Sequence, residues 1–238
     1  MLPEVCGQVL ERCAPDSIDP QVSSLFSFDE ATHGYSVDGI SVPSVTRTID
    51  HAGLVSYDMV REEILLRKSE IGTKVHRACH FFDDGDLDIE SLDYRIRGYV
   101  EAWIKFRNET GFCPYPGRIE ARFVVTINGM TVGLTVDRVG LFRKQETVVE
   151  IKTAAVAQRW WSVQLAGYAL GVPDHDGLKC SPMTLFHRRR RIAVQLFADG
   201  DYRKHNYEDT RDASVFISAL HVTHWKMANG SKLRRIEE

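Results

Sequence analysis

Apolar side chains recur at helical spacing in two long stretches of the first half of the chain. Residues 57–82 and 91–110 carry them three or four positions apart, which predicts two long helices. Gly72 marks an expected break or close-packing point in the first helix, and the acidic run at 83–88 is expected to form the turn between them.

A different pattern precedes these helices. Residues 26–42 alternate apolar and polar side chains around two turn signals, which predicts a small hairpin. Pro43 then ends the strand, and Ser44 is well placed to cap a short helix that runs through about residue 49.

The pattern becomes rich in β-formers from residue 119 onward. Runs at 119–127, 130–142 and 146–154 predict three antiparallel strands, with Asn128-Gly129 as a hairpin turn between the first two. The expected remainder is a helix at 155–170, strands at 183–187 and 191–197, and an amphipathic helix at 208–227. This order predicts an α/β (α+β) protein in which helices flank a mixed β-sheet core.

The length of 238 residues suits one domain with a substantial core. We expect a loose N-terminal segment at 1–24 and a single domain at 25–238. Within that domain, 25–118 form the hairpin and mainly helical part, and 119–238 form the sheet and later helices. The hydrophobic share of 43% and the charged share of 26% exclude a disordered, collagen-like or disulfide-dense chain.

Charge and cysteine content narrow the expected surroundings. The five cysteines are scattered without a CxxC pair, so we expect reduced thiols and no iron–sulfur cluster. No apolar stretch approaches the length of a membrane span, and no export signal is visible, which favours a cytoplasmic location without a membrane partner. The formal charge of -3 argues mildly against a dedicated nucleic-acid coat protein.

Three charged residues are expected to meet on adjacent strands. Glu150 and Lys152 are two residues apart on a strand and therefore leave the same face. A turn near residues 143–144 places Asp137 opposite them. Alone, Glu150 and Lys152 would be an ordinary surface pair. With Asp137 they form a group suited to Mg²⁺ or Mn²⁺, in which a lysine orients or deprotonates an attacking water.

This arrangement resembles the signature of the PD-(D/E)XK nuclease superfamily. Asp137 followed by Glu150-Ile151-Lys152 looks like the family motif, although Val136 stands where the naming proline would be. That departure is common in the branch that resembles RecB nuclease domains and lambda-type exonucleases.

Further motifs occur in the order of that branch. The segment 72–76 resembles its G-x-x-x-H helix, whose histidine would here be His76. Glu120 resembles an acid that lies upstream near the metal site. Gln164 and Tyr168 resemble a Q-x-x-x-Y motif, and their spacing places them on one helical face. Residues 33–49 look like the N-terminal segment of phage- or prophage-encoded members.

The resemblance implies a restriction-endonuclease-like fold and a deoxyribonuclease, expected to be an exonuclease of recombination or repair, that uses one or two Mg²⁺ or Mn²⁺ ions. It also implies a recombinase or annealing protein as a partner, and an oligomer in some relatives. The implied catalytic residues are Asp137, Glu150, Lys152, Glu120, Gln164 and Tyr168, and the implied metal site comprises His76, Asp137, Glu150 and Ile151.

Basic and aromatic residues supply candidate DNA contacts. The run Arg188, Arg189, Arg190 and Arg191 is expected in a loop between the two late strands, where it would either meet phosphates or form a solvated turn. The other candidates are Lys74 and Arg77 beside His76, and Arg159 with Trp160 after the catalytic strand. Trp160 and its neighbour Trp161 would either stack on bases or pack in the core.

Two other functions remain open at this point. One is a non-catalytic DNA-binding or scaffolding member of the same fold. The other is a metal-dependent hydrolase that acts on RNA or nucleotides. His76 and Tyr168 each have a plain structural alternative, because both residue types also pack in protein cores.

Overall fold

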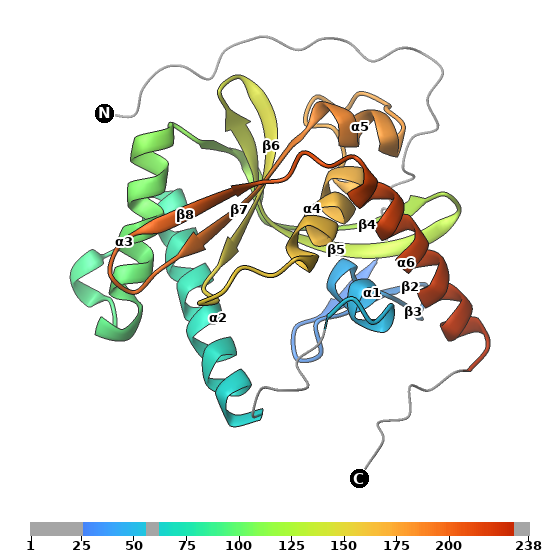
Figure 1. Cartoon of the computed structure of the whole chain (residues 1–238), viewed down its shortest axis with the longest axis horizontal. Helices are drawn as coiled ribbons and strands as arrows, with labels where there is room; N and C mark the ends of the chain where they lie inside the picture. Colours follow the sequence, from blue (N-terminus) through green and yellow to red (C-terminus); the bar gives the residue numbers. More distant parts are fainter. Residues whose placement is uncertain (1–25, 56–61, 231–238) are drawn as a thin grey trace.

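The computed structural model describes residues 26–55 and 62–230 and shows one mixed sheet of five strands (Figure 1). Its strands lie in chain order: β4 (Cys113–Ile127), β5 (Met130–Phe142), β6 (Gln145–Lys152), β7 (Arg190–Leu196) and β8 (Tyr202–Asn206). The pairs β4–β5, β5–β6 and β7–β8 are antiparallel, whereas β6 and β7 are parallel. The crossover between β6 and β7 makes the sheet mixed.

Helices cover both faces of this sheet and bury a separate core on each (Figure 1). One face carries α2 (Glu62–Asp84) and α3 (Tyr94–Thr110), and the other carries α1 (Val45–His51), α4 (Trp160–Gly171) and α6 (Arg211–Ala228). A 3-10 turn, η1 (Ile89–Ser91), links α2 to α3, and the short helix α5 (Pro182–Arg188) precedes β7. The predicted α+β class is therefore confirmed.

A second, three-stranded antiparallel sheet lies beside β5. It consists of β1 (Ser27–Asp29), β2 (Gly34–Val37) and β3 (Ile40–Val42), and confirms the alternation and both turns expected at 26–42. An isolated parallel bridge joins Ser44 to Gly133 of β5. Ser44 also caps α1, because its Oγ accepts a hydrogen bond of 3.0 Å from the Arg47 amide.

The hairpin that joins β4 to β5 and the one that joins β5 to β6 follow the sequence prediction. Asn128 and Gly129 have φ values of 50° and 77°, and Arg143 and Lys144 have φ values of 50° and 65°. Positive φ at both central residues is the requirement of the tight turn that matches strand twist. The turns therefore set the register that brings the ends of these strands together.

The segment 183–187, predicted as a strand, is a helix instead. Ser181 precedes it as the N-cap and accepts a 3.2 Å hydrogen bond from the Thr184 amide, and Pro182 occupies the first turn. These capping signals outweigh the β propensity of the apolar run, because five residues are too few for their periodicity to distinguish a helix from a strand. Strand β8 was not predicted at all, since its polar sequence shows little alternation.

Helix boundaries differ from the prediction at several points. α2 passes through Gly72 without a break, and a Cβ there would lie 3.5 Å from the Thr153 hydroxyl, an ordinary contact distance, so the structure shows neither the expected break nor close packing at this position. α2 also continues to Asp84, and α4 begins at Trp160 rather than near residue 155. The expected segment 1–24 and the start of the helix at 57 lie outside the described residues.

The domain limits stay predictions. Cys79 is a free thiol, whereas Cys180 is disulfide-bonded, so the expectation that all cysteines are reduced is wrong. Among the described residues, no helix combines the length and apolar character needed to cross a bilayer.

Candidate metal centre and active site

Three side chains from three elements converge where α2 passes the β4–β5 pair. His76 of α2, Glu120 of β4 and Asp137 of β5 each offer one ligand atom, and these atoms lie within 4.8 Å of one another. The Nδ1 atom of His76 is 3.4 Å from Asp137 Oδ1 and 3.6 Å from Glu120 Oε1. The structure thus brings these three side chains together, and their role as metal ligands stays a prediction.

The backbone of β4 is unusual at this point. The β4–β5 register shifts between Pro114 and Ile119, and Glu120 follows directly with a φ of 48°. A residue with a side chain in this left-handed region costs about 1–3 kcal/mol, which the surrounding structure must offset. The distortion aims the carboxylate of Glu120 at Asp137 on the next strand.

A buried ion-pair network of Arg138 and Asp83 fixes the position of Glu120. The Arg138 side chain is fully buried, and its Nη1 donates to Glu120 Oε1 at 3.0 Å and to the Asp137 carbonyl at 2.6 Å. Its Nε donates to the equally buried Asp83 at 2.5 Å. Asp83 also accepts from Arg107 and from the Trp103 indole. This network fixes Glu120, because a buried guanidinium tolerates few geometries.

Sequence reasoning missed Asp83 and Arg138. One available signal was spacing, since Asp83 follows His76 by seven residues, two helical turns, and thus shares its face of α2. Arg138 is next to Asp137 and therefore points to the opposite face of β5. A buried cation in the middle of a strand needs an acidic partner, which was a second signal.

The second half of the site lies at the end of β6. Arg138 pairs with Val149, which sets Asp137 beside Glu150. The Ile151 amide donates a 2.6 Å hydrogen bond to Asp137 Oδ2, so the predicted approach of these strands is confirmed. Lys152 Nζ lies 2.8 Å from Glu150 Oε1, as expected for residues that leave one face.

A polar chain continues from Lys152 across α4. The Nζ atom of Lys152 donates to Gln164 Oε1 at 2.8 Å, and Gln164 Nε2 donates to the Tyr168 hydroxyl at 3.0 Å. Gln164 Nε2 also donates to Thr46 Oγ1 at 3.3 Å. Gln164 and Tyr168 are both buried, and they face the site as their spacing predicted. Thr46 of α1 was not foreseen.

The proximity of these groups shifts their pKa values. Burial disfavours the charged imidazole, yet the carboxylates of Asp137 and Glu120 raise the pKa of His76 to about 10. Burial and then the Asp137 charge raise the pKa of Glu150 to about 7, against the effect of Lys152. The pKa of Asp137 is lowered despite its burial, chiefly by His76. Such opposed shifts are typical of functional sites.

The donor set fits a divalent cation. Glu150 Oε2 is buried and has no hydrogen-bond partner among the described residues. An orphaned carboxylate oxygen is costly unless a cation or water meets it. Asp137 lies beside Glu150 on the neighbouring strand and itself groups with Glu120 and His76, and oxygen-rich sets with one imidazole suit Mn²⁺ or Mg²⁺. The backbone of Ile151 lies at the site, whereas its side chain packs in the core.

The tryptophans predicted beside this site are packed around Lys152. Its Nζ lies 5.1 Å from the Trp160 ring centroid and 5.9 Å from that of Trp161. Trp161 is buried in the core, whereas Trp160 is half-buried and Arg159 is exposed. Core packing therefore accounts for Trp161, and a DNA contact by Arg159 or Trp160 stays a prediction.

The basic residues of α2 lie on its accessible side. Lys74 forms a 2.6 Å ion pair with Glu70, one turn earlier. Arg77 is exposed, with its guanidinium 5.5 Å from the Phe81 ring centroid. Neither contact is buried, so both contacts are weak and a phosphate could replace them. A DNA-binding role for these two side chains stays a prediction.

The four consecutive arginines do not form the loop that was predicted. Arg188 ends α5, where it pairs with Asp174, and Arg190 begins β7, where it binds Gln145. The Arg189 side chain is fully buried and pairs with Glu146. Arg191 is buried and pairs with Asp212 at 2.7 Å. The expected exposed row of guanidiniums is wrong for these last two, because Glu146 and Asp212 already neutralise them.

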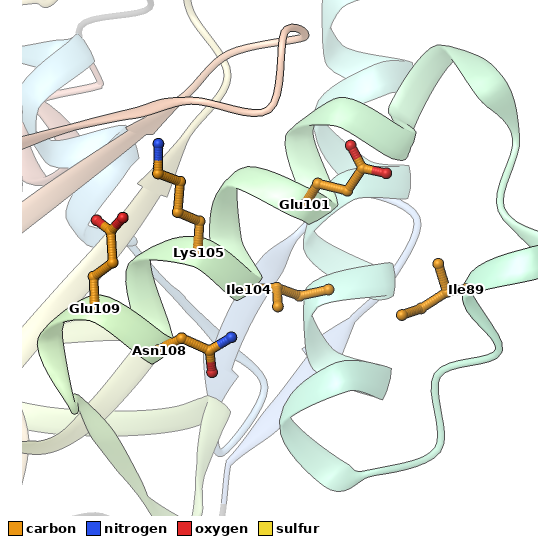
Figure 2. Close-up of a pocket in the computed structure, with 6 residues that line it drawn as sticks. All are labelled: Ile89, Glu101, Ile104, Lys105, Asn108 and Glu109. Carbon is orange, nitrogen blue, oxygen red and sulfur yellow. The ribbon is translucent and has the colours of Figure 1, made fainter.

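Not every depression belongs to the site. A pocket of about 520 Å³ lies on α3. Figure 2 shows its lining, which consists of Ile89 and the α3 side chains of Glu101, Ile104, Lys105, Asn108 and Glu109. None of the predicted site residues lines this pocket. Lys105 pairs with Asp201 at 3.1 Å. The pocket lies where Ile89 of η1 faces α3.

Comparisons with known proteins leave the family open. No family model matches the chain, and a search of curated proteins finds no relative. A crystal structure described as SSO0001 is 14% identical over 56% of this chain, with a TM-score of 0.33, and the chain spans 56% of that protein. LHK-Exo, solved in complex with dAMP, is 16% identical over 79% of this chain and 93% of its own, with a TM-score of 0.26. These low values carry no functional assignment.

Proposed function

We propose that this protein is a metal-dependent deoxyribonuclease of the PD-(D/E)XK type with a restriction-endonuclease-like core. The observation that carries the proposal is the junction of β5 and β6, where Asp137 receives the Ile151 amide and Glu150 pairs with Lys152. An acid on one strand and an acid–lysine pair on the next, with His76 and Glu120 alongside, support phosphodiester hydrolysis.

The residues that would hold the metal are His76, Glu120, Asp137 and Glu150. A divalent cation bound there supplies positive charge against the phosphate and makes water a better nucleophile at neutral pH. To hold the cation, His76 would have to present an unprotonated Nδ1, and so would have to release the proton that the two neighbouring carboxylates favour on its ring.

Lys152 positions the reacting groups. Two of its three N–H donors bind Glu150 and Gln164, which leaves one for a phosphate oxygen or a water. The Trp160 and Trp161 rings beside its ammonium restrict the approach of bulk water. Held in this way, the ammonium stabilises negative charge that develops on the phosphate.

Gln164 and Tyr168 act as positioning residues. Gln164 accepts from Lys152 and donates to Tyr168 and Thr46, so it ties the lysine to both α4 and α1. Since a misplacement of about 1 Å is enough to cost about a hundred-fold in rate, this chain matters although it need not touch substrate.

The finer proposal concerns substrate and role. We infer Mg²⁺ or Mn²⁺ as the cofactor, DNA ends as the substrate, and recombination or repair, with a recombinase or annealing protein, as the setting. Its support is the ordered set of motifs from residue 33 to 168. The accessible Arg77 and Arg159 are the candidate phosphate contacts near the site.

The test is a cleavage assay on end-labelled linear duplex, closed circular DNA, single-stranded DNA and RNA, each with and without Mg²⁺. We expect linear DNA to be degraded from its ends only with the metal. Asp137→Asn and Lys152→Met should each lower the rate by about a hundred-fold or more. Glu90→Gln removes a carboxylate that is 89% exposed, and serves as the matched control. Cleavage by Asp137→Asn at the parental rate would refute the proposal, and cleavage of RNA alone would refute the DNA assignment.

A further inference from the structure

A second cavity opens beside the metal centre. It has a volume of about 270 Å³ and is lined by residues of β1, β2, α1, β5 and α4 and of the turn before β2. Its walls include the four rings of Phe28, His33, Tyr35 and Tyr168 and the aliphatic hydroxyls of Ser44, Thr46 and Thr135. We call it the aromatic pocket. No acidic side chain lines it among the described residues.

The aromatic pocket is held in shape by close packing. Gly133 of β5 leaves room for the Tyr35 ring, because a Cβ there would lie 2.3 Å from its Cγ. The Tyr35 hydroxyl is hydrogen-bonded to Thr135. The Phe28 ring centroid is 4.8 Å from that of Tyr35 and 5.9 Å from that of His33. The rings are therefore placed before any ligand binds, which limits the entropy lost on binding.

The pocket and the metal centre share a wall. Thr135 precedes Asp137 by two residues on β5, so both side chains leave the same face, about 7 Å apart along the strand. Tyr168 and Thr46 line the pocket, and both are bonded to Gln164, which in turn binds Lys152. A ligand in the pocket is thus one nucleotide or so from a phosphate at the metal centre.

A positively charged side chain contacts one ring of the pocket. The Arg122 guanidinium is 4.1 Å from the Phe28 ring centroid, and its pairing with Glu30 is largely exposed. An exposed pair is weak and can exchange its acid for a phosphate. The rings of the pocket would contact a base, the guanidinium beside Phe28 would contact the backbone of the strand, and the metal centre would contact the scissile phosphate.

We propose that the aromatic pocket binds the nucleobase of a nucleotide adjacent to the scissile phosphate. The proposal rests on the nuclease function above and names a binding site for its substrate. The pocket is smaller than the usual site for a large organic ligand, and suits a single flat ring system. Binding is sequence-tolerant, because each base offers the same kind of face to the aromatic wall.

The experiment combines a protein change with a substrate change. Phe28→Leu keeps apolar volume without a ring, and Phe28→Tyr keeps the ring. The substrates are oligonucleotides with one abasic site, moved one position at a time past the cleaved bond. Trp225→Ala removes a ring that is 64% exposed on α6 and is the control, expected to match the parent.

We expect Phe28→Leu to lower kcat/KM on intact DNA by about ten- to a hundred-fold, and Phe28→Tyr to stay near the parent. One abasic position should lower the parent by a similar factor. At that position the loss in Phe28→Leu should vanish, since the ring no longer has a partner. An equal loss on intact and abasic DNA, or no loss on either, would overturn the pocket assignment.

Equilibrium binding of the same oligonucleotides separates this inference from the function itself. If the parent binds DNA in a manner that depends on both Phe28 and the base but does not cleave it with Mg²⁺, the pocket stands and the nuclease proposal falls. If cleavage is metal-dependent but indifferent to Phe28, the reverse holds. A parent that neither binds nor cleaves DNA overturns both. Circular dichroism and the melting temperature confirm that each variant is folded.

Discussion

Replacement of Arg189 by methionine tests whether the arginine run is structural or binds DNA. Its side chain is fully buried, pairs with Glu146, and donates to the carbonyls of Ala169, Val172 and Pro173 at the end of α4. A cation at a helix C-terminus satisfies carbonyls that lack helical partners. Methionine keeps the apolar stem but leaves Glu146 and three carbonyls without this donor.

The expected cost is large. Removal of one partner from a buried ion pair lowers the free energy of unfolding by about 3–5 kcal/mol, a large part of the total stability of a typical domain. In a chain of this size, each kcal/mol lowers the melting temperature by about 2–4 °C, so a decrease of about 6–20 °C is expected. Arg190→Met is the matched control. It loses hydrogen bonds to the neutral Gln145 and a contact of its guanidinium with the Phe142 ring, 5.1 Å from the ring centroid, with an expected effect of about 1–2 kcal/mol.

Urea unfolding followed by tryptophan fluorescence measures the stability of both variants. DNA affinity is then measured at several salt concentrations, at a temperature where each variant is folded. If Arg189 contacted a phosphate, its loss would reduce the salt slope by about 0.9 on duplex DNA. An unchanged unfolding midpoint together with such a smaller slope would refute the structural role. We expect the reverse, a lower midpoint with an unchanged slope.

Three further predictions concern the metal centre. Asp83→Asn should weaken Mn²⁺ binding, measured by calorimetry, by about ten- to a hundred-fold, because Arg138 then holds Glu120 less firmly; unchanged affinity would contradict this. A divalent cation at about a hundred times its Kd should raise the unfolding free energy of the parent by about 2.7 kcal/mol, and that of Asp137→Ala much less. In the metal-free protein, the pKa of Glu150 is raised from 4.5 to about 7, so its carboxyl group keeps a proton in the folded state. The stabilisation from this group is therefore fully present below about pH 4.5 and is lost as the pH rises through about 7. Urea midpoints of the parent should therefore fall across this range relative to Glu150→Gln, and parallel curves would exclude the shift.

The sequence determines the part of the site that lies on β5 and β6. Asp137, Glu150 and Lys152 could be placed together because strand alternation has a period of two and the 143–144 turn sets the register. Gln164 and Tyr168 likewise follow from helical spacing. These are local rules, and they hold wherever the strands and helices form.

Other features depend on contacts between distant parts of the chain. Arg189 and Arg191 look like DNA contacts until Glu146 and Asp212 are seen to neutralise them, from 43 and 21 residues away in sequence. The same limitation applies to Asp83, which meets Arg138 across 55 residues. A pattern within one segment records whether a charge is present, but not which distant acid is buried against it.

The aromatic pocket shows this difference most directly. Three of its rings belong to the N-terminal strands and turn, whereas Thr135 and the ring of Tyr168 belong to β5 and α4, and Tyr35 meets Thr135 across 100 residues. Alternation explains each strand separately and predicts no cavity. The pocket exists because Gly133 admits the Tyr35 ring, which brings the small sheet against the large one. Local spacing therefore accounts for the acids that can bind a metal, and long-range packing for the surface that would receive the substrate.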